Sequence, residues 1–393
     1  MKKKKLYILS PCDRFNYGDL MFNYILENVF KEDDIELIYC AFSESDLSSL
    51  GGKPTFSYEV LYSLDNEYDN YVIIGGGESL CASWESIMAS SCHHLKSLRD
   101  YIYKLKYLGP YLAWTIIKLL KLVTPRKTRF PYSIGKHELN NIKSVLYNSV
   151  GGDCVKNLDQ QSIDIIKDND YLAVRDILTH DNLKGMGIPS IVVPDSVIIL
   201  SDIFTDDFLD NMVSTQVKSL FYSELKNKAY IYFQINMNLW YANKANVISE
   251  IQHIINDDLY EIVLCPIGTA SHHMDQVAMK DIHTIFPVCH YIVDPSVFDI
   301  AFLINKASLY IGSSLHGIIT SMSYNIPFLS FGNRKAYNYI KTWDAQNLSI
   351  HVCDISNIHL HYRRAIEQKY NPSSQKEQYY KSLSSLKSPI INS

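Results

Sequence analysis

The sequence predicts an α/β protein in which two Rossmann-like domains, each a doubly wound parallel sheet, face each other across a cleft. Apolar runs without alternation recur along the chain and are followed by turn residues, which is typical of strands buried on both faces. Helical segments lie between many of these runs, and alternation of strand and helix indicates parallel sheets with helices outside. Two such sets occur, so we expect a ligand between them, at the carboxyl ends of the strands.

The two sets of predicted strands define the domains. The first set lies in 1–200, with apolar runs at 6–10, 35–42, 70–77, 130–135, 171–176 and 190–196. The second set lies in 229–345, with runs at 230–236, 261–268, 290–293, 308–314 and 327–332. The polar stretch 201–228 is predicted to be a helical linker. The remainder, 346–393, is predicted to hold a short C-terminal helix at 362–370 and a mobile, Ser/Lys-rich tail.

The overall composition bounds the partners and the compartment. The net charge of −5 provides no global basic field, so we expect no nucleic-acid partner. The apolar run after the basic N-terminus is too short for a signal peptide, and we expect a cytoplasmic protein. The eight cysteines show no C-x-x-C motif and no metal-like spacing, so we expect reduced core residues. They are Cys12, Cys40, Cys81, Cys92, Cys154, Cys265, Cys289 and Cys353.

The segment 93–130 does not fit a plain sheet layer, because it carries nine Lys/Arg and one Asp around a strongly apolar stretch. Two interpretations stay open. One is a basic amphipathic helix that lies on the anionic inner face of the cell membrane as a peripheral contact. The other is a helical insertion packed on the first domain, with solvated lysines.

The first strand-to-helix turn offers four candidate ligand-binding residues. Gly18 allows a tight turn, and Asp19 can cap the helix that follows. The N–H groups of such a turn favour an anion, and Asn16 and Arg14 lie in the same loop. Ordinary turn chemistry is the alternative explanation of this motif.

Three glycines follow the strand at 70–77 directly. Gly75, Gly76 and Gly77 permit close backbone approach to a ligand and a nest of N–H donors. The pattern is not G-x-G-x-x-G and no Walker lysine follows it, so neither a nicotinamide nor a nucleotide P-loop is supported.

Charged residues end the last two strands predicted in the first domain. Arg175 is well placed to bind a phosphate or carboxylate, although an ion pair with Asp176 that orders the loop explains it equally well. Asp195 also ends a strand, and capping of the next helix is its default role.

The stretch 310–340 contains the strongest candidate for chemistry. It runs strand, turn, helix, strand, and His316 falls in the first turn of the helix. The N–H groups of Ser313, Ser314 and Gly317 are expected to face the cleft. There the helix dipole favours a neutral imidazole, whereas a bound anion favours imidazolium, so His316 is a candidate anion ligand or proton donor. A hydrogen-bonded histidine at a domain interface is the alternative.

The residues His272, His273 and Asp275 offer a weaker signal. Adjacent histidines point in different directions, so we expect no shared metal ion there. A loop contact to an acceptor is possible in principle, but a solvated loop is the expected structure.

Taken in order, these motifs resemble the polysaccharide pyruvyl transferase family, over most of the chain. The shared parts are Asn16-x-Gly18-Asp19, Gly75-Gly76-Gly77, Val174-Arg175-Asp176, Pro194-Asp195, Leu315-His316-Gly317, and Pro327 followed by Lys335. The resemblance implies a GT-B-like pair of Rossmann-like domains. It also implies transfer of the enolpyruvyl unit of phosphoenolpyruvate to two hydroxyls of a sugar or lipid-linked oligosaccharide, as in bacterial surface polysaccharide, exopolysaccharide or capsule biosynthesis. The product is a pyruvate ketal.

That chemistry assigns roles to the candidate residues. Protonated His316 would donate a proton to the methylene carbon of the donor or grip the departing phosphate, and Asp19 would accept the hydroxyl proton. This scheme requires no metal and no cofactor. Many family members carry an arginine where this chain has Ser314, so Arg175, Lys335 or Arg14 would take over the charges of the donor.

Two other functions remain open. One is a nucleotide-sugar-dependent glycosyltransferase with the same two-domain architecture, in which His316 and helix N-termini hold a diphosphate. The other is a non-catalytic partner in a membrane-associated polysaccharide assembly complex, for which Ser314 and the segment 93–130 are the clues.

Overall fold

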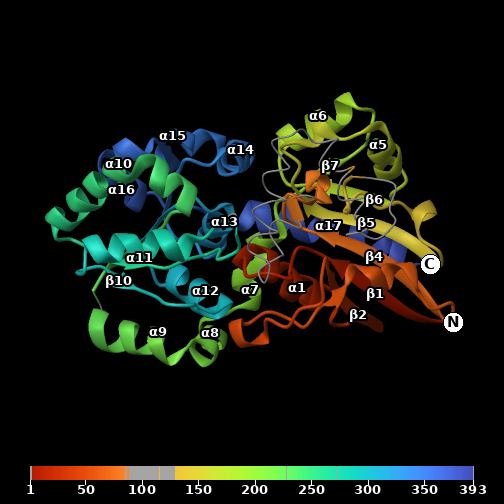
Figure 1. The fold of residues 1–393 in the computed structure, drawn as a ribbon, viewed down its shortest axis with the longest axis horizontal. Coiled ribbons are helices and arrows are strands. Elements are labelled where there is room, and N and C mark those ends of the chain that lie inside the picture. The colour runs from red at the N-terminus through yellow and green to blue at the C-terminus, as the bar shows by residue number, and fades with distance from the viewer. Residues whose placement is uncertain are drawn as a thin grey trace.

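The computed structural model describes residues 2–84, 86–87, 115, 129–226, 228–271 and 273–392. The chain forms two α/β domains that lie side by side (Figure 1). Both expectations for the segment 93–130 fall outside the described residues, apart from residues 115, 129 and 130. Among the helices that the structure describes, none is both long and apolar enough to cross a membrane.

The N-terminal domain contains a seven-stranded sheet in the order β3-β2-β1-β4-β5-β6-β7, with every pair parallel. The strands are β1 (Lys3–Leu9), β2 (Ile35–Ala41), β3 (Phe56–Ser57), β4 (Tyr68–Gly75), β5 (Ile142–Val150), β6 (Tyr171–Val174) and β7 (Ile191–Val192). Its described helices of at least two turns are α1 (Tyr17–Phe30), α5 (Gln160–Lys167) and α6 (Ile177–Gly185).

The C-terminal domain contains a six-stranded parallel sheet in the order β10-β9-β8-β11-β12-β13. Its strands are β8 (Tyr230–Gln234), β9 (Glu261–Leu264), β10 (His290–Tyr291), β11 (Leu309–Gly312), β12 (Phe328–Phe331) and β13 (Val352–Cys353). Its helices are α10 (Met237–Asp257), α11 (Asp275–Ile285), α12 (Val297–Asn305), α13 (Leu315–Ser323), α14 (Arg334–Trp343), α15 (Leu348–His351) and α16 (Ile358–Glu367).

Short helices connect the two sheets: α7 (Leu200–Ile203), α8 (Asp206–Met212), α9 (Thr215–Ser219) and a π-helical segment at Leu220–Leu225. The two parallel sheets with helices on their faces confirm the predicted fold class.

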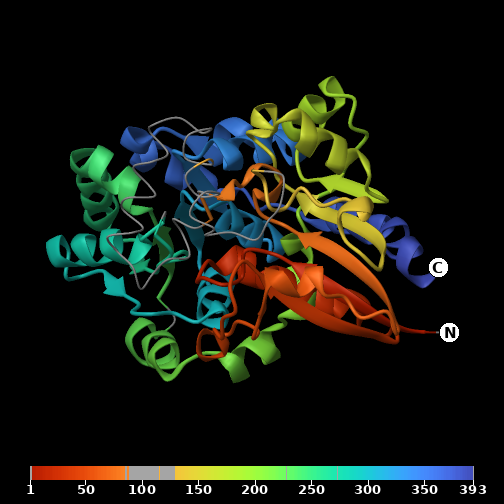
Figure 2. The ribbon, with the colours of Figure 1, turned by 45° about the vertical axis from the view of Figure 1, so that its right-hand side comes forward.

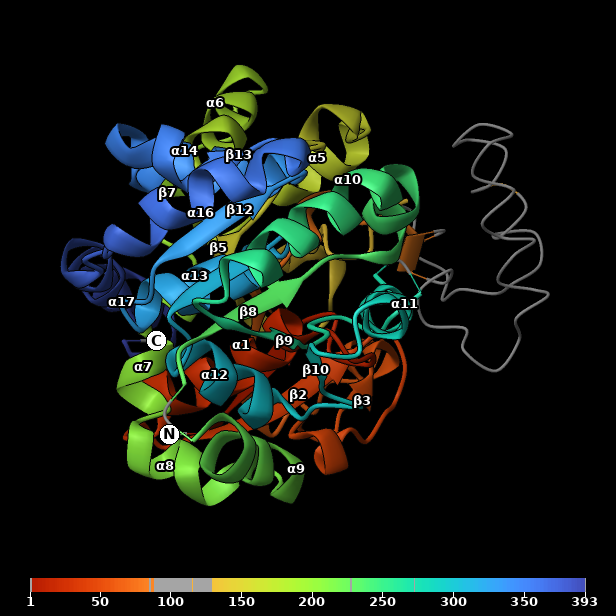
Figure 3. The same cartoon turned by 90° about the vertical axis from the view of Figure 1, so that its left-hand side faces the viewer.

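Residue alternation along the strands explains how the layers pack. In β8, Tyr230 and Tyr232 join an apolar cluster with α12 and α13, whereas Ile231 and Phe233 join a second cluster with α10, α11 and α16 (Figure 3). Successive side chains point to opposite faces of a strand, so both faces of the sheet are covered. The first cluster continues through α1 into the N-terminal sheet, and the two domains therefore share one apolar core.

Two elements differ from the sequence-based expectations. The run 130–135 is irregular, and the interior strand β5 lies at Ile142–Val150 instead. The strand β5 was missed because its sequence, IKSVLYNSV, is interrupted by polar residues, yet its last seven residues are buried. The buried side chain of Asn148 is hydrogen-bonded to the hydroxyl of Tyr379, 3.3 Å away, which explains its tolerance in the core.

The expected mobile tail is wrong, because Ser373–Ile391 forms a regular helix, α17. This helix lies beside the N-terminal sheet, and both chain termini lie at the same end of the molecule (Figures 1 and 2). Lys4 Nζ donates to the carbonyl oxygen of Ile390 at 2.7 Å, and Lys387 Nζ lies 2.6 Å from Asp33 Oδ2. The chain therefore returns from the C-terminal domain to cover the first sheet.

Candidate functional site

A cavity of about 750 Å³ lies between the domains, at the carboxyl ends of strands from both sheets. The backbone closes one side of it, where Tyr17 N–H donates to the carbonyl of Ile267 at 3.0 Å. Nine residues predicted from the sequence line this cavity, namely Arg14, Asn16, Asp19, Gly77, Arg175, Ser313, Ser314, His316 and Lys335. The tertiary structure thus brings together side chains that are up to 321 positions apart in the sequence.

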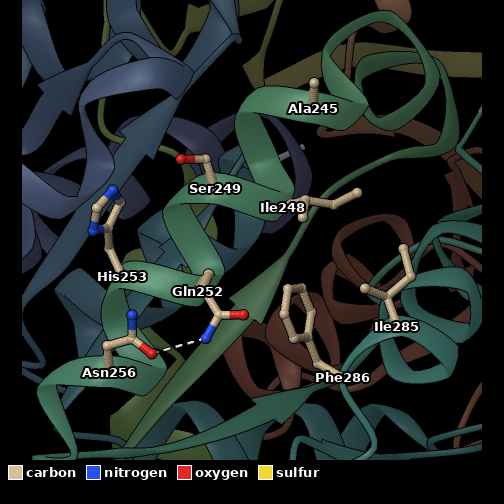
Figure 4. Close-up of a pocket in the computed structure, with 8 residues that line it drawn as sticks. All are labelled: Ala245, Ile248, Ser249, Gln252, His253, Asn256, Ile285 and Phe286. Carbon is tan, nitrogen blue, oxygen red and sulfur yellow. Dashed lines mark hydrogen bonds between the residues drawn. The ribbon is translucent and has the colours of Figure 1, made fainter.

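A second hollow, of about 570 Å³, lies between α10 and α11 (Figure 4). Its lining residues are Ala245, Ile248, Ser249, Gln252, His253, Asn256, Ile285 and Phe286. These eight include no lysine, arginine or carboxylate, and the amide of Gln252 is turned to Asn256 (Figure 4). The hollow therefore offers little to a charged donor, and we place the candidate site in the interdomain cavity.

His316 is held at the second residue of α13. Ser314 caps the helix, since its Oγ accepts the Gly317 N–H at 3.4 Å. The imidazole is 8% exposed, and its Nε2 lies 3.7 Å from Asp195 Oδ2. The ring also meets Phe22 of α1 edge-on, with the ring centres 5.5 Å apart. His316 is thus at a domain interface and on the wall of the cavity at once.

A buried chain of charges begins at Asp195, which sequence reasoning assigned only to capping. Asp195 Oδ2 accepts from Arg175 Nη1 at 3.2 Å, and Arg175 Nη2 lies 2.5 Å from Glu78 Oε1. Burial raises the pKa of Asp195, but the nearby His316 imidazole and the Arg175 guanidinium outweigh it and hold that pKa below its ordinary value. The carboxylate is therefore ionised and available to an imidazolium.

Arg175 forms its ion pairs with Glu78 and Asp195 rather than with Asp176. The guanidinium is 2% exposed, and its pKa is raised because Glu78 and Asp195 outweigh the effect of burial. Asp176 instead caps α6, accepting the Thr179 N–H at 2.8 Å. A donor in the cavity would meet an arginine whose charge is already balanced on two sides.

The expected N–H donors after β11 are already occupied. Gln234 Oε1, at the end of β8, accepts from the N–H groups of both Ser313 and Ser314, each at 3.0 Å. The Gly317 N–H is taken by the Ser314 cap. Ser313 and Ser314 line the cavity as expected, but their N–H groups are engaged by Gln234 of a neighbouring strand, and that of Gly317 by the Ser314 side chain.

Asp19 lines the same cavity from the N-terminal domain, on the first turn of α1. Its Oδ2 accepts from Asn16 Nδ2 at 2.7 Å, and the side chain is almost completely buried. Burial raises the pKa of Asp19 above its ordinary value, although Arg14 and His316 partly offset this. Arg14 pairs with Asp13 at 3.0 Å. Asp19 is thus a carboxyl group suited to accept or donate a proton.

The predicted glycines divide into two kinds. Gly77 lines the cavity in a left-handed conformation, with φ of +64°. Gly76, at φ +50°, would place a Cβ 1.8 Å from the Phe22 ring, and Gly18 would place one 1.8 Å from His316 Nδ1. Gly75 ends β4 in ordinary contact with its neighbours. Gly18, Gly75 and Gly76 are not on the cavity wall, and Gly18 and Gly76 are needed for close packing behind it.

Lys335 supplies a cation to the cavity. It lies at the start of α14, where Asn333 caps the helix by accepting the Lys335 N–H at 2.9 Å. Among the residues that the structure describes, its ammonium group forms no ion pair. Its charge nevertheless lowers the pKa of Glu78, together with Arg175 and against the effect of burial. The Lys335 ammonium group is therefore available to bind an anionic ligand.

Two cysteines on the cavity wall correct the expectation of reduced thiols. Cys81 and Cys154 form a disulfide that joins the short helix after the glycine run to the loop after β5. Cys92 lies outside the described residues, and the remaining five are free thiols, namely Cys12, Cys40, Cys265, Cys289 and Cys353. The pairing was not evident from the sequence because the two positions are 73 residues apart.

The loop expected to be solvated is partly buried. Asp275 is 1% exposed, and its Oδ2 accepts from Gln234 Nε2 at 2.8 Å and from the N–H groups of Ile267 and Gly268 at 3.0 Å. Burial raises its pKa to about 6. Asp275 thereby orients Gln234, which holds the turn before His316. His273 lines the cavity, and His272 lies outside the described residues.

Sequence reasoning missed several residues of the site. Glu78, Asp153, Tyr132, Gln234 and Asn333 line the cavity. The sequence held a usable signal for two of them. Glu78 directly follows the glycine run, and Gln234 ends a buried strand. Tyr132 gave no such signal, because the run around it was assigned to a strand.

Solved structures share this architecture at low sequence identity. The UDP-GlcNAc 2-epimerase from Methanocaldococcus jannaschii is 13% identical, with a TM-score of 0.55 over 94% of this chain and 95% of the other. The S. aureus MnaA–UDP co-structure is 13% identical, with a TM-score of 0.56 over 98% and 92%. The UDP-GlcNAc-bound 2-epimerase from Neisseria meningitidis is 12% identical, with a TM-score of 0.54 over 98% and 95%. These likenesses show a GT-B-like fold.

Sequence comparison identifies the family. No curated protein sequence matches the chain significantly. The polysaccharide pyruvyl transferase family, in contrast, matches residues 16–335, a range that begins in the loop before α1 and ends at the start of α14. The match contains Asp19, Arg175, His316 and Lys335, which meet in the cavity. The resemblance expected from the motifs is thereby confirmed, and the chain belongs to the polysaccharide pyruvyl transferase family.

Proposed function

We propose that the protein transfers the pyruvyl unit of phosphoenolpyruvate to two hydroxyl groups of a sugar, forming a cyclic ketal and releasing phosphate. The observation that carries this proposal is a buried imidazole, backed by a carboxylate, on the wall of an interdomain cavity that is also lined by a second carboxyl group, Asp19. The acceptor would be a sugar or lipid-linked oligosaccharide of surface polysaccharide synthesis.

The donor carries a phosphate and a carboxylate, so its site must supply positive charge. Among the lysine and arginine side chains that line the cavity, Lys335 is the one that forms no ion pair with a described residue. Arg14 lies in the same cavity. We assign Lys335 to the phosphate or carboxylate of the donor, in the place of the arginine that Ser314 replaces. Arg175 contributes by neutralising Glu78 and Asp195, which would otherwise repel an anion.

The first half of the reaction adds one sugar hydroxyl across the double bond of the donor. Imidazolium His316 gives its proton to the methylene carbon, which becomes a methyl group, and the adjacent carbon becomes cationic. The hydroxyl oxygen bonds to that carbon and Asp19 takes the hydroxyl proton. A positioned acid of this kind contributes roughly 10²–10⁴-fold to the rate.

The second half closes the ketal. The C–O bond to phosphate breaks, the same carbon becomes cationic again, and the second hydroxyl bonds to it and loses its proton. After the first half, neutral His316 accepts the proton of the second hydroxyl and regains its charge, whereas Asp19, which is then protonated, gives its proton to the departing phosphate. The two hydroxyl protons thus replace the proton that His316 gave to carbon and supply the one that leaves with phosphate.

The test is phosphate release from phosphoenolpyruvate by the purified protein, with a panel of sugar acceptors. Thermal shift with phosphoenolpyruvate and with nucleotide sugars such as UDP-GlcNAc, side by side, separates the alternatives. A ligand at 100 times its Kd adds about 2.7 kcal/mol to stability. Stabilisation by nucleotide sugars alone would indicate a glycosyltransferase, and stabilisation by phosphoenolpyruvate without turnover on any acceptor would indicate a non-catalytic partner.

A further inference from the structure

We propose that Asp195 is a positioning residue that fixes the proton of His316 on Nε2 and leaves Nδ1 as the atom that acts on the substrate. The geometry behind this is the placement of the two ring nitrogens. Nε2 is buried without a hydrogen bond shorter than 3.5 Å, and Asp195 Oδ2 lies 3.7 Å from it. His316 lines the cavity, and Nδ1 is the ring nitrogen left to face a ligand there, while the ring packs against Gly18.

The Asp195 carboxylate is itself held on both oxygens. Its Oδ1 accepts the Val197 N–H at 3.1 Å, and its Oδ2 accepts from Arg175 Nη1 at 3.2 Å while facing His316. Asp195 is completely buried, so its charge acts on the imidazole without screening by solvent. A carboxylate so held can only act as an acceptor toward Nε2, so it favours the tautomer with the proton on that nitrogen.

The contacts of Arg175 extend the positioning of His316 to further residues of the N-terminal domain. Arg175 also binds Glu78, whose Oε2 accepts the Asp153 N–H at 3.0 Å. Gly151 permits this approach, because a Cβ there would lie 2.4 Å from Glu78 Oε1. The orientation of an imidazole on the C-terminal domain is therefore set by Asp195 and Arg175, which follow β7 and β6, and through Arg175 by the loops after β4 and β5.

The consequence for catalysis is a defined proton donor. As imidazolium, His316 keeps one N–H on Asp195 and presents the other, on Nδ1, to the substrate. After donation the ring returns to the Nε2–H tautomer, the form that Asp195 stabilises. Asp195 itself does not line the cavity and need not touch substrate.

The first measurement needs no variant at Asp195. In histidine-specific ¹⁵N-labelled protein at a pH where the ring is neutral, the His316 signals, assigned by their loss in His316→Gln, should show a protonated Nε2 and an unprotonated Nδ1. His283 is an internal reference, because its Nδ1 lies 2.9 Å from the carbonyl oxygen of Cys289. A protonated Nδ1 on neutral His316 in the wild-type protein would overturn the proposal.

The second measurement uses Asp195→Asn. The amide must turn its NH₂ either to the Val197 N–H or to the position shared by Arg175 and Nε2, so the Nε2–H tautomer loses its acceptor or its geometry. The expected effect on activity rests on the proposed function. We expect kcat for phosphate release to fall about 10–100-fold, as for loss of a residue that orients a catalytic histidine. The KM for phosphoenolpyruvate should change less than about threefold, since no donor contact is removed.

The control is Asp299→Asn. Asp299 is equally buried and accepts from Ser214 N–H and Ser296 N–H, but lies outside the cavity. It should lower the melting temperature while leaving kcat and the His316 signals unchanged. Unaltered ring signals or unaltered kcat in folded Asp195→Asn would refute the positioning role. If the wild-type protein releases no phosphate, the proposed function fails, whereas the ¹⁵N signals still decide the tautomer.

Discussion

The His316 ring lies so close over Gly18 that a Cβ at this glycine would be 1.8 Å from Nδ1 and 2.0 Å from Cγ. Gly18 is on α1 of the N-terminal domain and His316 on α13 of the C-terminal domain. The two domains thus meet at a position that only glycine leaves open, directly beside the candidate proton donor. This contact explains why glycine occupies the first turn of a helix, where alanine would ordinarily be preferred.

Replacement of Gly18 by alanine should therefore displace the imidazole. We expect a loss of about 1–3 kcal/mol in the free energy of unfolding, as for an overpacked core, together with a large fall in phosphate release. Denaturant unfolding and the activity assay measure the two effects. The matched control is Gly185→Ala at the end of α6, where a Cβ meets nothing within 4 Å. If Gly18→Ala behaves like that control, the close packing is not required.

Removal of the imidazole should abolish turnover without abolishing binding. In His316→Gln we expect phosphate release to fall at least about 10²-fold, because the acid for the methylene carbon is lost. Thermal stabilisation by phosphoenolpyruvate should persist, since Lys335 is retained. His137→Gln, at a side chain that is 90% exposed and outside the cavity, serves as the control. Wild-type rates in His316→Gln would remove this residue from the mechanism.

Loss of the Lys335 ammonium group should weaken binding of the donor more than it lowers kcat. For Lys335→Met we expect the KM for phosphoenolpyruvate to rise about 10–100-fold, the size of a lost hydrogen bond to a charged group. Lys341→Met tests the same change on the same helix, α14, at a position outside the cavity. An unchanged KM in Lys335→Met would assign the charges of the donor to other groups, with Arg14 the next candidate.

Asp275 should make the stability of the protein depend on pH. Its pKa is about 6 in the folded protein against an ordinary value of 3.8, because burial disfavours the carboxylate. The folded state therefore binds this proton more tightly than the unfolded chain, so the contribution of Asp275 falls as pH rises from about 4 to about 6 and stays low above that. Asparagine at this position has no proton to lose.

The free energy of unfolding of the wild type, relative to Asp275→Asn, should consequently drop by about 2 kcal/mol between pH 4 and pH 7. Urea unfolding of both proteins at these two pH values measures it. Asparagine can keep an oxygen toward Gln234 and the N–H groups of Ile267 and Gly268, so the variant should fold. A difference that is constant across this range would contradict the raised pKa.

The basic segment 93–130 supports a prediction from sequence alone. If it contacts an anionic membrane surface, the double change Lys118→Glu and Lys121→Glu should weaken sedimentation of the protein with vesicles that contain anionic lipid. Vesicles of neutral lipid serve as the control. If the wild-type protein does not sediment with either kind of vesicle, the proposed peripheral contact is excluded.

Local patterns were sufficient for much of the fold. The continuous apolar runs predicted β1, β2, β4 and the strands β8 to β12 close to their observed positions, because burial on both faces leaves a signal within a few residues. The polar interior strand β5, the two-residue edge strand β13 and the helix α17 carried no such signal. β5 tolerates its polar side chains through partners elsewhere in the chain, and α17 is stabilised by contacts with the distant N-terminal domain.

The sequence by itself determined the two-domain α/β class, the glycine-rich and serine-flanked turns, and the presence of a histidine at a strand-to-helix junction. Only the tertiary structure decided which partner each polar group meets. In the folded protein, the Ser313 and Ser314 amides donate hydrogen bonds to Gln234. Arg175 forms ion pairs with Glu78 and Asp195, and the His316 ring packs against Gly18. The physical reason is that secondary structure follows from short-range periodicity, whereas hydrogen bonds and ion pairs in a closed cavity depend on groups that the chain brings together from both domains.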